Sequence, residues 1–252
     1  MKPLEIYKNV FGILRIDNRL KENNARVVGT GFIINTNPLY VLTCNHVVGE
    51  GTEHNDGNIS YALIKRSDSN AKDFDLGKFE ITFLKAKKIV FKPEVDLAVL
   101  TIDTSIDPKA AEKMGLLDIE GLELDFDSNS SEMGLPVEWI SAGTLGDFSI
   151  TPRLFKGNIV TKYSKNNQYK FTNPDGVETT ATMHGINLFE VDQLFFPGCS
   201  GSPILSPANG KVIGWVHGFN SWQLPPNVTA SLSIGISMSN IQDFLKESNF
   251  IK

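Results

Sequence analysis

One short segment, FFPGCSGSPI at 195–204, carries the residues of this chain best suited to chemistry. It places Ser200 between Cys199 and Gly201, with a second glycine at 198 and a proline on either side. A serine acts as a nucleophile when a base lies within hydrogen-bond reach, a third group orients that base, and donors receive the developing oxyanion. A tight surface turn is the alternative interpretation, and the remaining residues decide between the two.

The candidate bases are the four histidines of the chain, at 46, 54, 184 and 217. His46 follows an apolar run in YVLTCNHVV, so the end of a strand would hold it rigidly. His217 also ends an apolar run and is either a core histidine or a cleft-lining one. We expect His54, in the polar segment GEGTEHNDGN, to be solvated, and His184 has no obvious acidic neighbour.

The candidate acid is Asp96, which directly precedes the alternating run LAVLTI in FKPEVDLAVLTID. A carboxylate that leads into a buried strand is costly unless it has a partner, and a histidine N–H is such a partner. Taken alone, Asp96 would be interpreted as a surface turn residue.

The order of the three candidates strengthens the catalytic interpretation. His46, Asp96 and Ser200 follow one another as in chymotrypsin-type barrels, whereas subtilisins have the order Asp, His, Ser. An α/β-hydrolase would need Ser, Asp, His and a G-x-S-x-G elbow. Here Ser202 stands where that elbow has its second glycine, and no histidine follows His217.

The elements that must position these residues are short β-rich runs separated by Gly, Asn, Asp, Ser and Pro clusters. Many short strands at this spacing indicate an all-β sandwich or barrel. The expected strands are 10–16, 25–35, 40–43, 59–64, 79–84, 87–91 and 97–102 in the first half, and 137–143, 154–163, 186–191, 202–206, 211–218 and 232–237 in the second.

Two segments depart from this pattern. Residues 103–135 contain PKAAEKMG, which predicts a helical turn, followed by an acidic, strand-poor connection between the two halves. At the end, Ile241, Phe244 and Leu245 recur at helical spacing, and Ser239 is a plausible N-cap. We therefore expect a C-terminal amphipathic helix at about 239–250.

Composition narrows the class of protein. The 252 residues are 41% apolar and 21% charged with a net charge of -5, which is typical of a soluble globular protein and argues against a general nucleic-acid binder. No apolar run approaches the roughly 18 residues of a membrane span. With only two cysteines, Cys44 and Cys199, and no signal-peptide pattern, we expect a cytoplasmic protein with free thiols and no membrane association.

The motifs GTGFIIN, YVLTCNHVV, DLAVL and GCSGSPI together resemble those of the chymotrypsin-like (trypsin-like) serine proteases. The resemblance is to the bacterial high-temperature-requirement (HtrA) branch, without its PDZ domain. It implies an all-β fold of two six-stranded antiparallel barrels with a C-terminal helix. Residues 1–120 would form the barrel that carries His46 and Asp96, and 121–252 the barrel that carries Ser200.

The resemblance also implies a role for each residue. Ser200 would attack the scissile carbonyl, His46 would be the general base, and Asp96 would fix the tautomer of His46. The backbone N–H groups of Gly198 and Ser200 would form the oxyanion hole. The substrate pocket would be shallow and apolar, with its wall formed by Leu194, Phe195, His217, Phe219 and Gly235.

The expected activity is that of a cofactor-free, metal-free serine endopeptidase that cleaves a protein or peptide partner and does not bind nucleic acid. A monomer is the expected state. Two alternatives stay open: a catalytically silent protease-fold scaffold or peptide-binding module, and an esterase on the same scaffold. Cys199 as the nucleophile is a weaker idea, because the serine is present beside it.

Overall fold

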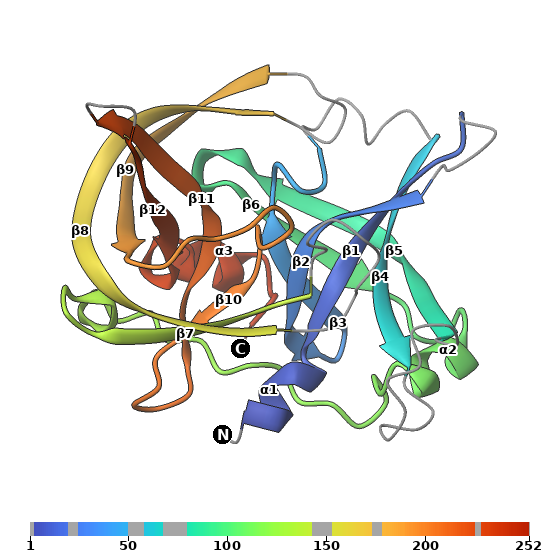
Figure 1. The fold of residues 1–252 in the computed structure, drawn as a ribbon. Coiled ribbons are helices and arrows are strands. Elements are labelled where there is room, and N and C mark those ends of the chain that lie inside the picture. The colour runs from blue at the N-terminus through green and yellow to red at the C-terminus, as the bar shows by residue number, and fades with distance from the viewer. Residues whose placement is uncertain are drawn as a thin grey trace.

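The computed structural model describes residues 3–19, 25–49, 58–67, 80–142, 153–172, 178–224 and 228–251. The chain forms two closed antiparallel β-barrels of six strands each, which lie side by side (Figure 1). This confirms the predicted double-barrel architecture.

The first barrel is built from strands within residues 10–102, in the order β1-β2-β3-β6-β5-β4. Closure of the sheet removes both edges and buries one face of every strand. Its strands are β1 (Val10–Asp17), β2 (Ala25–Thr36), β3 (Leu39–Cys44), β4 (Ile59–Ser67), β5 (Glu80–Lys92) and β6 (Leu97–Ile102).

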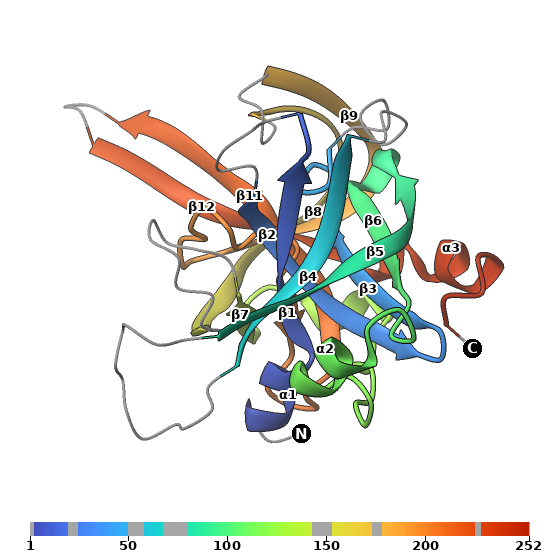
Figure 2. The ribbon, with the colours of Figure 1, turned by 90° about the vertical axis from the view of Figure 1, so that its right-hand side faces the viewer.

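The second barrel lies within residues 136–237, in the order β10-β11-β12-β9-β8-β7. The strands of this barrel are β7 (Pro136–Ser141), β8 (Arg153–Thr172), β9 (Glu178–Val191), β10 (Pro203–Leu205), β11 (Val212–Leu224) and β12 (Val228–Ser237). The hairpin formed by β11 and β12 projects well beyond the body of the molecule (Figure 2).

Large apolar side chains fill the barrels and the space between them. Trp139 and Phe189 are fully buried inside the second barrel, where the ring of Phe195 packs edge-on against Trp139 at 4.8 Å between centroids. Trp215 belongs instead to the larger apolar cluster, which contains residues of both barrels. A core that is continuous across the barrels fixes them relative to each other, so a site at their interface can be rigid.

The connection between the barrels contains the predicted helical turn, α2 (Pro108–Lys113). Asp107 caps it by accepting a hydrogen bond from Ala110 N at 2.9 Å, and Pro108 occupies the first helical position. The remainder includes the 3₁₀ turn η3 (Ser128–Ser131). The predicted domain boundary at 120/121 falls in this connection and stays a prediction.

Several predicted elements differ from the structure in extent. Strands β8, β9 and β11 extend well beyond the expected runs 154–163, 186–191 and 211–218. The segments 79–84 and 87–91 form one strand, β5, because a β-bulge between Ala86 and Lys88 keeps the pairing with β6 continuous.

The C-terminal helix is shorter than 239–250, and Ser239 is not its N-cap. The 3₁₀ turn η4 (Met238–Asn240), capped by Ser237, precedes α3 (Gln242–Glu247), whose N-cap residue Ile241 gives no side-chain hydrogen bond. The reason is Asn240, whose Nδ2 donates to the carbonyls of Ser237 and Asn187 and so ties this turn to β9.

A six-residue helix, α1 (Pro3–Lys8), precedes the first strand. No helix in the described ranges is long and apolar enough to span a membrane.

Candidate active site

The pairing of β3 with β6 brings the first two candidate residues together. Cys44, the last residue of β3, pairs with Leu97, the first of β6, so the residues just beyond them, 45–46 and 96, face each other. The 3₁₀ turn η2 (Pro93–Val95) ends at Asp96, which has a left-handed backbone with φ of 49°. Its carbonyl accepts a hydrogen bond from Asn45 N at 3.1 Å.

His46 is held by the Asp96 carboxylate at two points. Its backbone N–H donates to Oδ1 at 2.9 Å, and its ring Nδ1 lies 2.8 Å from Oδ2. Asp96 is 1% exposed, whereas the His46 side chain retains 14% of its exposure. The acid is therefore enclosed while the base reaches the surface.

The environment of Asp96 keeps its carboxyl ionised. Burial by itself would raise the pKa of Asp96, but the charges and hydrogen bonds of His46 and His217 outweigh it and hold that pKa well below its ordinary value. An ionised carboxylate only accepts hydrogen bonds, so Nδ1 of His46 carries a proton and Nε2 is its acceptor nitrogen when the ring is neutral.

His217 contacts the same carboxylate from the other barrel. Its Nδ1 lies 2.6 Å from Asp96 Oδ2, and its ring stands nearly perpendicular to that of His46, with 5.6 Å between the centroids. The side chain is 6% exposed. Sequence reasoning placed His217 in the wall of the substrate pocket, whereas the structure turns its imidazole inwards to Asp96.

The predicted nucleophile lies in a compact turn. Gly198 and Gly201 have φ of 94° and 84°, a region that L residues with side chains rarely adopt. The turn is closed by hydrogen bonds from Cys199 N to Phe196 O and from Ser202 N to Cys199 O, both 2.9 Å. Within the described part of the chain, neither Gly198 N nor Ser200 N has an acceptor, so both can serve an oxyanion.

Thr30 of the first barrel holds this turn in place. Its N–H donates to Ser200 O at 2.9 Å, and its Oγ1 donates to Gly198 O at 2.8 Å. Sequence reasoning missed Thr30. The available signal was its position between Gly29 and Gly31, since a Cβ at Gly29 would lie 2.6 Å from Val47 and 3.0 Å from Ser200 O.

The hydroxyl of Ser200 makes a long hydrogen bond to the carbonyl of His217, at 3.4 Å. In the described part of the chain it has no hydrogen bond to His46. Catalytic hydrogen bonds are often long or misaligned before substrate binds, so this geometry is compatible with a triad that closes in the complex.

Residues 29–214 match the family model described as the trypsin-like peptidase domain, about three quarters of the chain. The chain belongs to the trypsin-like peptidase family. No curated protein matches the sequence.

Solved structures support the fold of this trypsin-like domain. The crystal structure of Deg5 is 18% identical, with a TM-score of 0.57 over 96% of this chain and 90% of that one. The thermostable serine protease AL20 from an extremophilic microorganism is 13% identical, with a TM-score of 0.56 over 98% of this chain and 100% of that one. At these identities the likeness establishes the double barrel alone.

The predicted pocket residues of the trypsin-like domain divide into two groups. Leu194 and Phe219 are 42% and 55% exposed and offer apolar surface to a ligand. Phe195 is buried against Trp139, and a Cβ at Gly235 would lie 2.5 Å from the ring of Phe189, so these two adjoin the barrel core. Their part in substrate binding stays a prediction.

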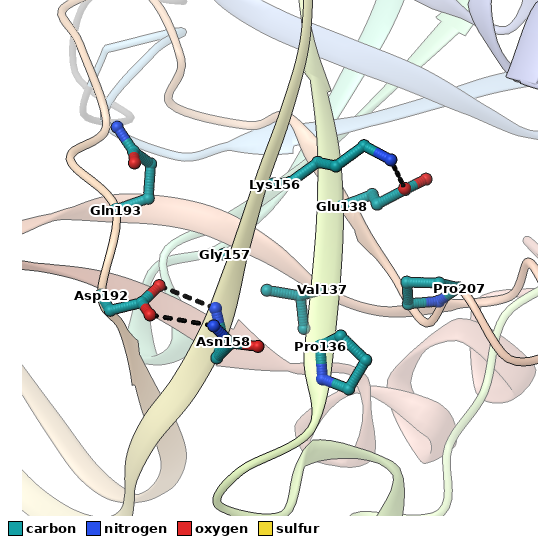
Figure 3. A pocket seen from close by; sticks show the side chains of 9 residues that line it. All are labelled: Pro136, Val137, Glu138, Lys156, Gly157, Asn158, Asp192, Gln193 and Pro207. Carbon is teal, nitrogen blue, oxygen red and sulfur yellow. Dashed lines mark hydrogen bonds and ion pairs between the residues drawn. The ribbon is translucent and has the colours of Figure 1, made fainter.

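A separate hollow of about 490 Å³ lies on the second barrel, between β7, β8 and residues 192–193 (Figure 3). Its lining includes Asp192, which accepts hydrogen bonds from N and Nδ2 of Asn158 at 2.7 and 3.0 Å. None of the three predicted triad residues lines this hollow. It is therefore distinct from the candidate active site.

Asp96 and three side chains around it have the chemistry of metal ligands. Cys44, His46, Asp96 and His217 each offer one ligand atom, all within 4.8 Å of one another. However, both Nδ1 atoms lie 2.6–2.8 Å from Asp96 Oδ2, whereas two ligands of a tetrahedral zinc stand about 3.3 Å apart. The arrangement fits a hydrogen-bonded cluster better than a metal site.

Both cysteines of the domain are free and buried. Burial, followed by the nearby Asp96 carboxylate, raises the pKa of Cys44 well above its ordinary value, and its Sγ donates to Val216 O at 3.2 Å. Burial also raises the pKa of Cys199. Since the thiolate is the reactive form, neither thiol is suited to act as a nucleophile.

Proposed function

We propose that this chain is a serine endopeptidase that hydrolyses peptide bonds through a covalent acyl-enzyme. The observation that carries the proposal is the double contact of Asp96 with His46, which fixes the imidazole at the barrel interface with Nε2 as its acceptor. Acyl transfer requires a histidine with a free acceptor nitrogen, a serine nucleophile, and N–H groups that can receive an oxyanion. His46 and the Ser200 turn supply these groups.

The proposed reaction has two halves. Ser200 Oγ attacks the scissile carbonyl as His46 Nε2 takes its proton, and the oxyanion is received by the N–H groups of Gly198 and Ser200. His46 then protonates the leaving amine, and the acyl-enzyme remains on Ser200. Water, deprotonated by His46, attacks the ester and releases the acid product and the free serine.

One movement must precede the attack. The Ser200 hydroxyl has to leave the His217 carbonyl and turn towards His46, and rotation about its χ1 bond is the movement we propose. Staggered rotamers of a serine differ little in energy, so substrate binding can readily supply this change.

The proposed substrate is a protein segment with an apolar residue at the cleavage site. Leu194 and Phe219 support this, since both expose apolar surface and neither carries a charge that would select a basic side chain. The physiological target is proposed to be a particular protein partner.

The test is labelling of the purified chain with a fluorophosphonate probe, followed by mass spectrometry of the modified peptide. We expect one adduct, on Ser200. Ser200→Ala should abolish it and reduce kcat/KM on peptide substrates by at least about 10⁴-fold, and His46→Ala should have nearly the same effect, because triad members act as a unit. Substantial turnover by Ser200→Ala would sink the proposal.

Ser202→Ala is the matched control. This serine lies two residues away and is fully buried, and its Oγ has no hydrogen-bond partner within the described part of the chain. Its removal should leave both the adduct and the turnover unchanged.

One observation favours the alternative of a catalytically silent, peptide-binding module. The Ser200 hydroxyl is bonded to the His217 carbonyl and not to the base. If that state persists with ligand, peptides should bind to wild type and to Ser200→Ala alike, and no fluorophosphonate adduct should form on either.

A further inference from the structure

His217 occupies a β-bulge on β11. Val216 pairs with Gly235 and Gly218 with Ile234 of β12, so His217 is the residue inserted at the shift in register. A bulge re-aims a side chain relative to regular alternation. Here it coincides with an imidazole that turns out of its own barrel and meets Asp96 of the other one.

The contact between His217 and Asp96 is short and enclosed. Nδ1 lies 2.6 Å from Oδ2, and the two side chains are 6% and 2% exposed. A hydrogen bond to an ionised acceptor, shielded from water, is among the stronger ones in proteins. It also joins residues 121 positions apart in the sequence, one from each barrel.

The Asp96 carboxylate is held by three N–H groups. His46 N contacts Oδ1, and the Nδ1 atoms of His46 and His217 both contact Oδ2. Because the carboxylate is ionised, each of these nitrogens is a donor. With His46 alone the carboxylate would have partners only from its own barrel, whereas the contact from His217 braces it from the opposite side.

We propose that His217 is a positioning residue of the active site: its Nδ1–H holds the Asp96 carboxylate in the plane and orientation that fix the tautomer of His46. The inference rests on the proposed peptidase function. His217 acts through Asp96 and does not itself touch the reacting atoms with its side chain.

The backbone of the same segment has a separate role that the experiment must not disturb. Val216 O accepts hydrogen bonds from Gly201 N and Cys44 Sγ, and His217 O accepts one from Ser200 Oγ. Substitutions at 217 should therefore change the side chain while keeping the size and the bulge. Leucine removes the donor at similar volume, and asparagine places its Nδ2 donor near the position of Nδ1.

The experiment compares kcat and KM of wild type, His217→Leu and His217→Asn. We expect His217→Leu to lower kcat about 10- to 100-fold, the range for losing one hydrogen bond to a charged group, with little change in KM. His217→Asn should recover most of the loss. A rise in KM at unchanged kcat would overturn the proposal in favour of a role in substrate binding.

A double-mutant cycle separates positioning from general structural support. If His217 acts through Asp96, adding His217→Leu to an Asp96→Asn variant should lower kcat hardly any further. Equal losses in both backgrounds would overturn the proposal.

A readout independent of turnover distinguishes failure of the proposed function from failure of this inference. Nitrogen-15 NMR of the imidazoles reports the tautomer of His46 in any folded chain. We expect an Nδ1–H tautomer in wild type and His217→Asn, and a mixture in His217→Leu. An unchanged tautomer in His217→Leu would overturn the role of His217, even if wild type proves unable to label at Ser200.

Discussion

The two halves of the candidate site are held in different ways. His46 and Asp96 are fixed mainly inside the first barrel, by the pairing of β3 with β6 and by hydrogen bonds between neighbouring turns. The Ser200 turn, in contrast, depends on the first barrel, because Thr30 donates to the carbonyls of Ser200 and Gly198. The base is positioned mainly by its own barrel, whereas the turn of the nucleophile is held by both barrels.

This difference indicates where the site is most easily damaged. Substitutions near the contact of β3 with β6 should affect the base alone. Substitutions at the contact between Thr30 and the Ser200 turn should affect both the nucleophile and the packing of the two barrels against each other. His217 is the exception on the second barrel, since it reaches back to Asp96. Three changes, from the largest expected effect to the smallest, would break or sharpen this contrast.

Gly201→Ala should have the largest effect. A Cβ at this position would lie 2.1 Å from Thr30 O and 2.4 Å from Thr43 Oγ1, and φ is 84°. We expect the free energy of unfolding to fall by about 4 kcal/mol, since a backbone clash adds to left-handed strain, and fluorophosphonate labelling to be lost. Urea unfolding measures the first and mass spectrometry the second.

Gly115→Ala is the control for the backbone term alone. Its φ is 71°, but a Cβ there meets nothing within 4 Å. We expect Gly115→Ala to lower the free energy of unfolding by about 1 kcal/mol and to leave fluorophosphonate labelling intact. Equal losses in the two variants would show that the tight contact with Thr30 is unimportant.

Asp96 should make stability depend on acidic pH. Its folded-state pKa is depressed, so its charge stabilises the fold above the unfolded-state pKa of about 3.9, and this contribution is lost as the pH falls below that value. Relative to Asp96→Asn, wild type should be more stable by about 2–3 kcal/mol above pH 5, and the difference should shrink towards about pH 3.

Unfolding by urea at a series of pH values measures this difference. Asp118→Asn, at an exposed position in the connection between the barrels, is the control and should follow wild type throughout. A difference between wild type and Asp96→Asn that stays constant down to pH 3 would contradict the assignment.

Thr30→Val should have the smallest effect of the three. Valine keeps the shape but removes the donor to Gly198 O and the acceptor for Ala142 N. We expect a loss of about 1–2 kcal/mol in the free energy of unfolding and slower labelling of Ser200, because the oxyanion turn is less firmly held. Thr36→Val, at the exposed end of the same strand, should change neither; unaltered labelling in Thr30→Val would refute the bracing role.

Much of the fold could be predicted because short apolar runs and the turn residues between them are local signals. LAVLTI, an apolar run between Asp96 and Asp103, forms β6 with the expected bounds, and five of its six residues are buried. The continuity of β5 through its bulge could not be predicted, since it depends on the register with β6. The C-terminal helix was overestimated for a similar reason, because Asn240 bonds to a strand distant in the sequence.

The candidate site shows the same limit. The meeting of His46 with Asp96 was expected from strand ends and residue types, and the structure brings them to 2.8 Å. The inward turn of His217 was not, because a bulge is a property of two paired strands and no motif in VIGWVHG marks it. Thr30 was missed for a related reason: its partners are backbone carbonyls, so the residue types at 198 and 200 do not reveal the contact, and only the flanking Gly29 and Gly31 hint at a close approach.

The lateness of β11 in the chain has a consequence for how the protein is made. His46 and Asp96 are synthesised within the first hundred residues, but the strand that carries His217 and receives the N–H of Gly201 begins only at Val212. A nascent chain with a finished first barrel holds His46 and Asp96 but lacks Ser200. Even after Ser200 has been added, its turn lacks the support of β11 until more residues emerge from the ribosome. The order of translation thus withholds an assembled candidate site until β11 has been synthesised, and a product terminated before that strand would lack the proposed peptidase activity.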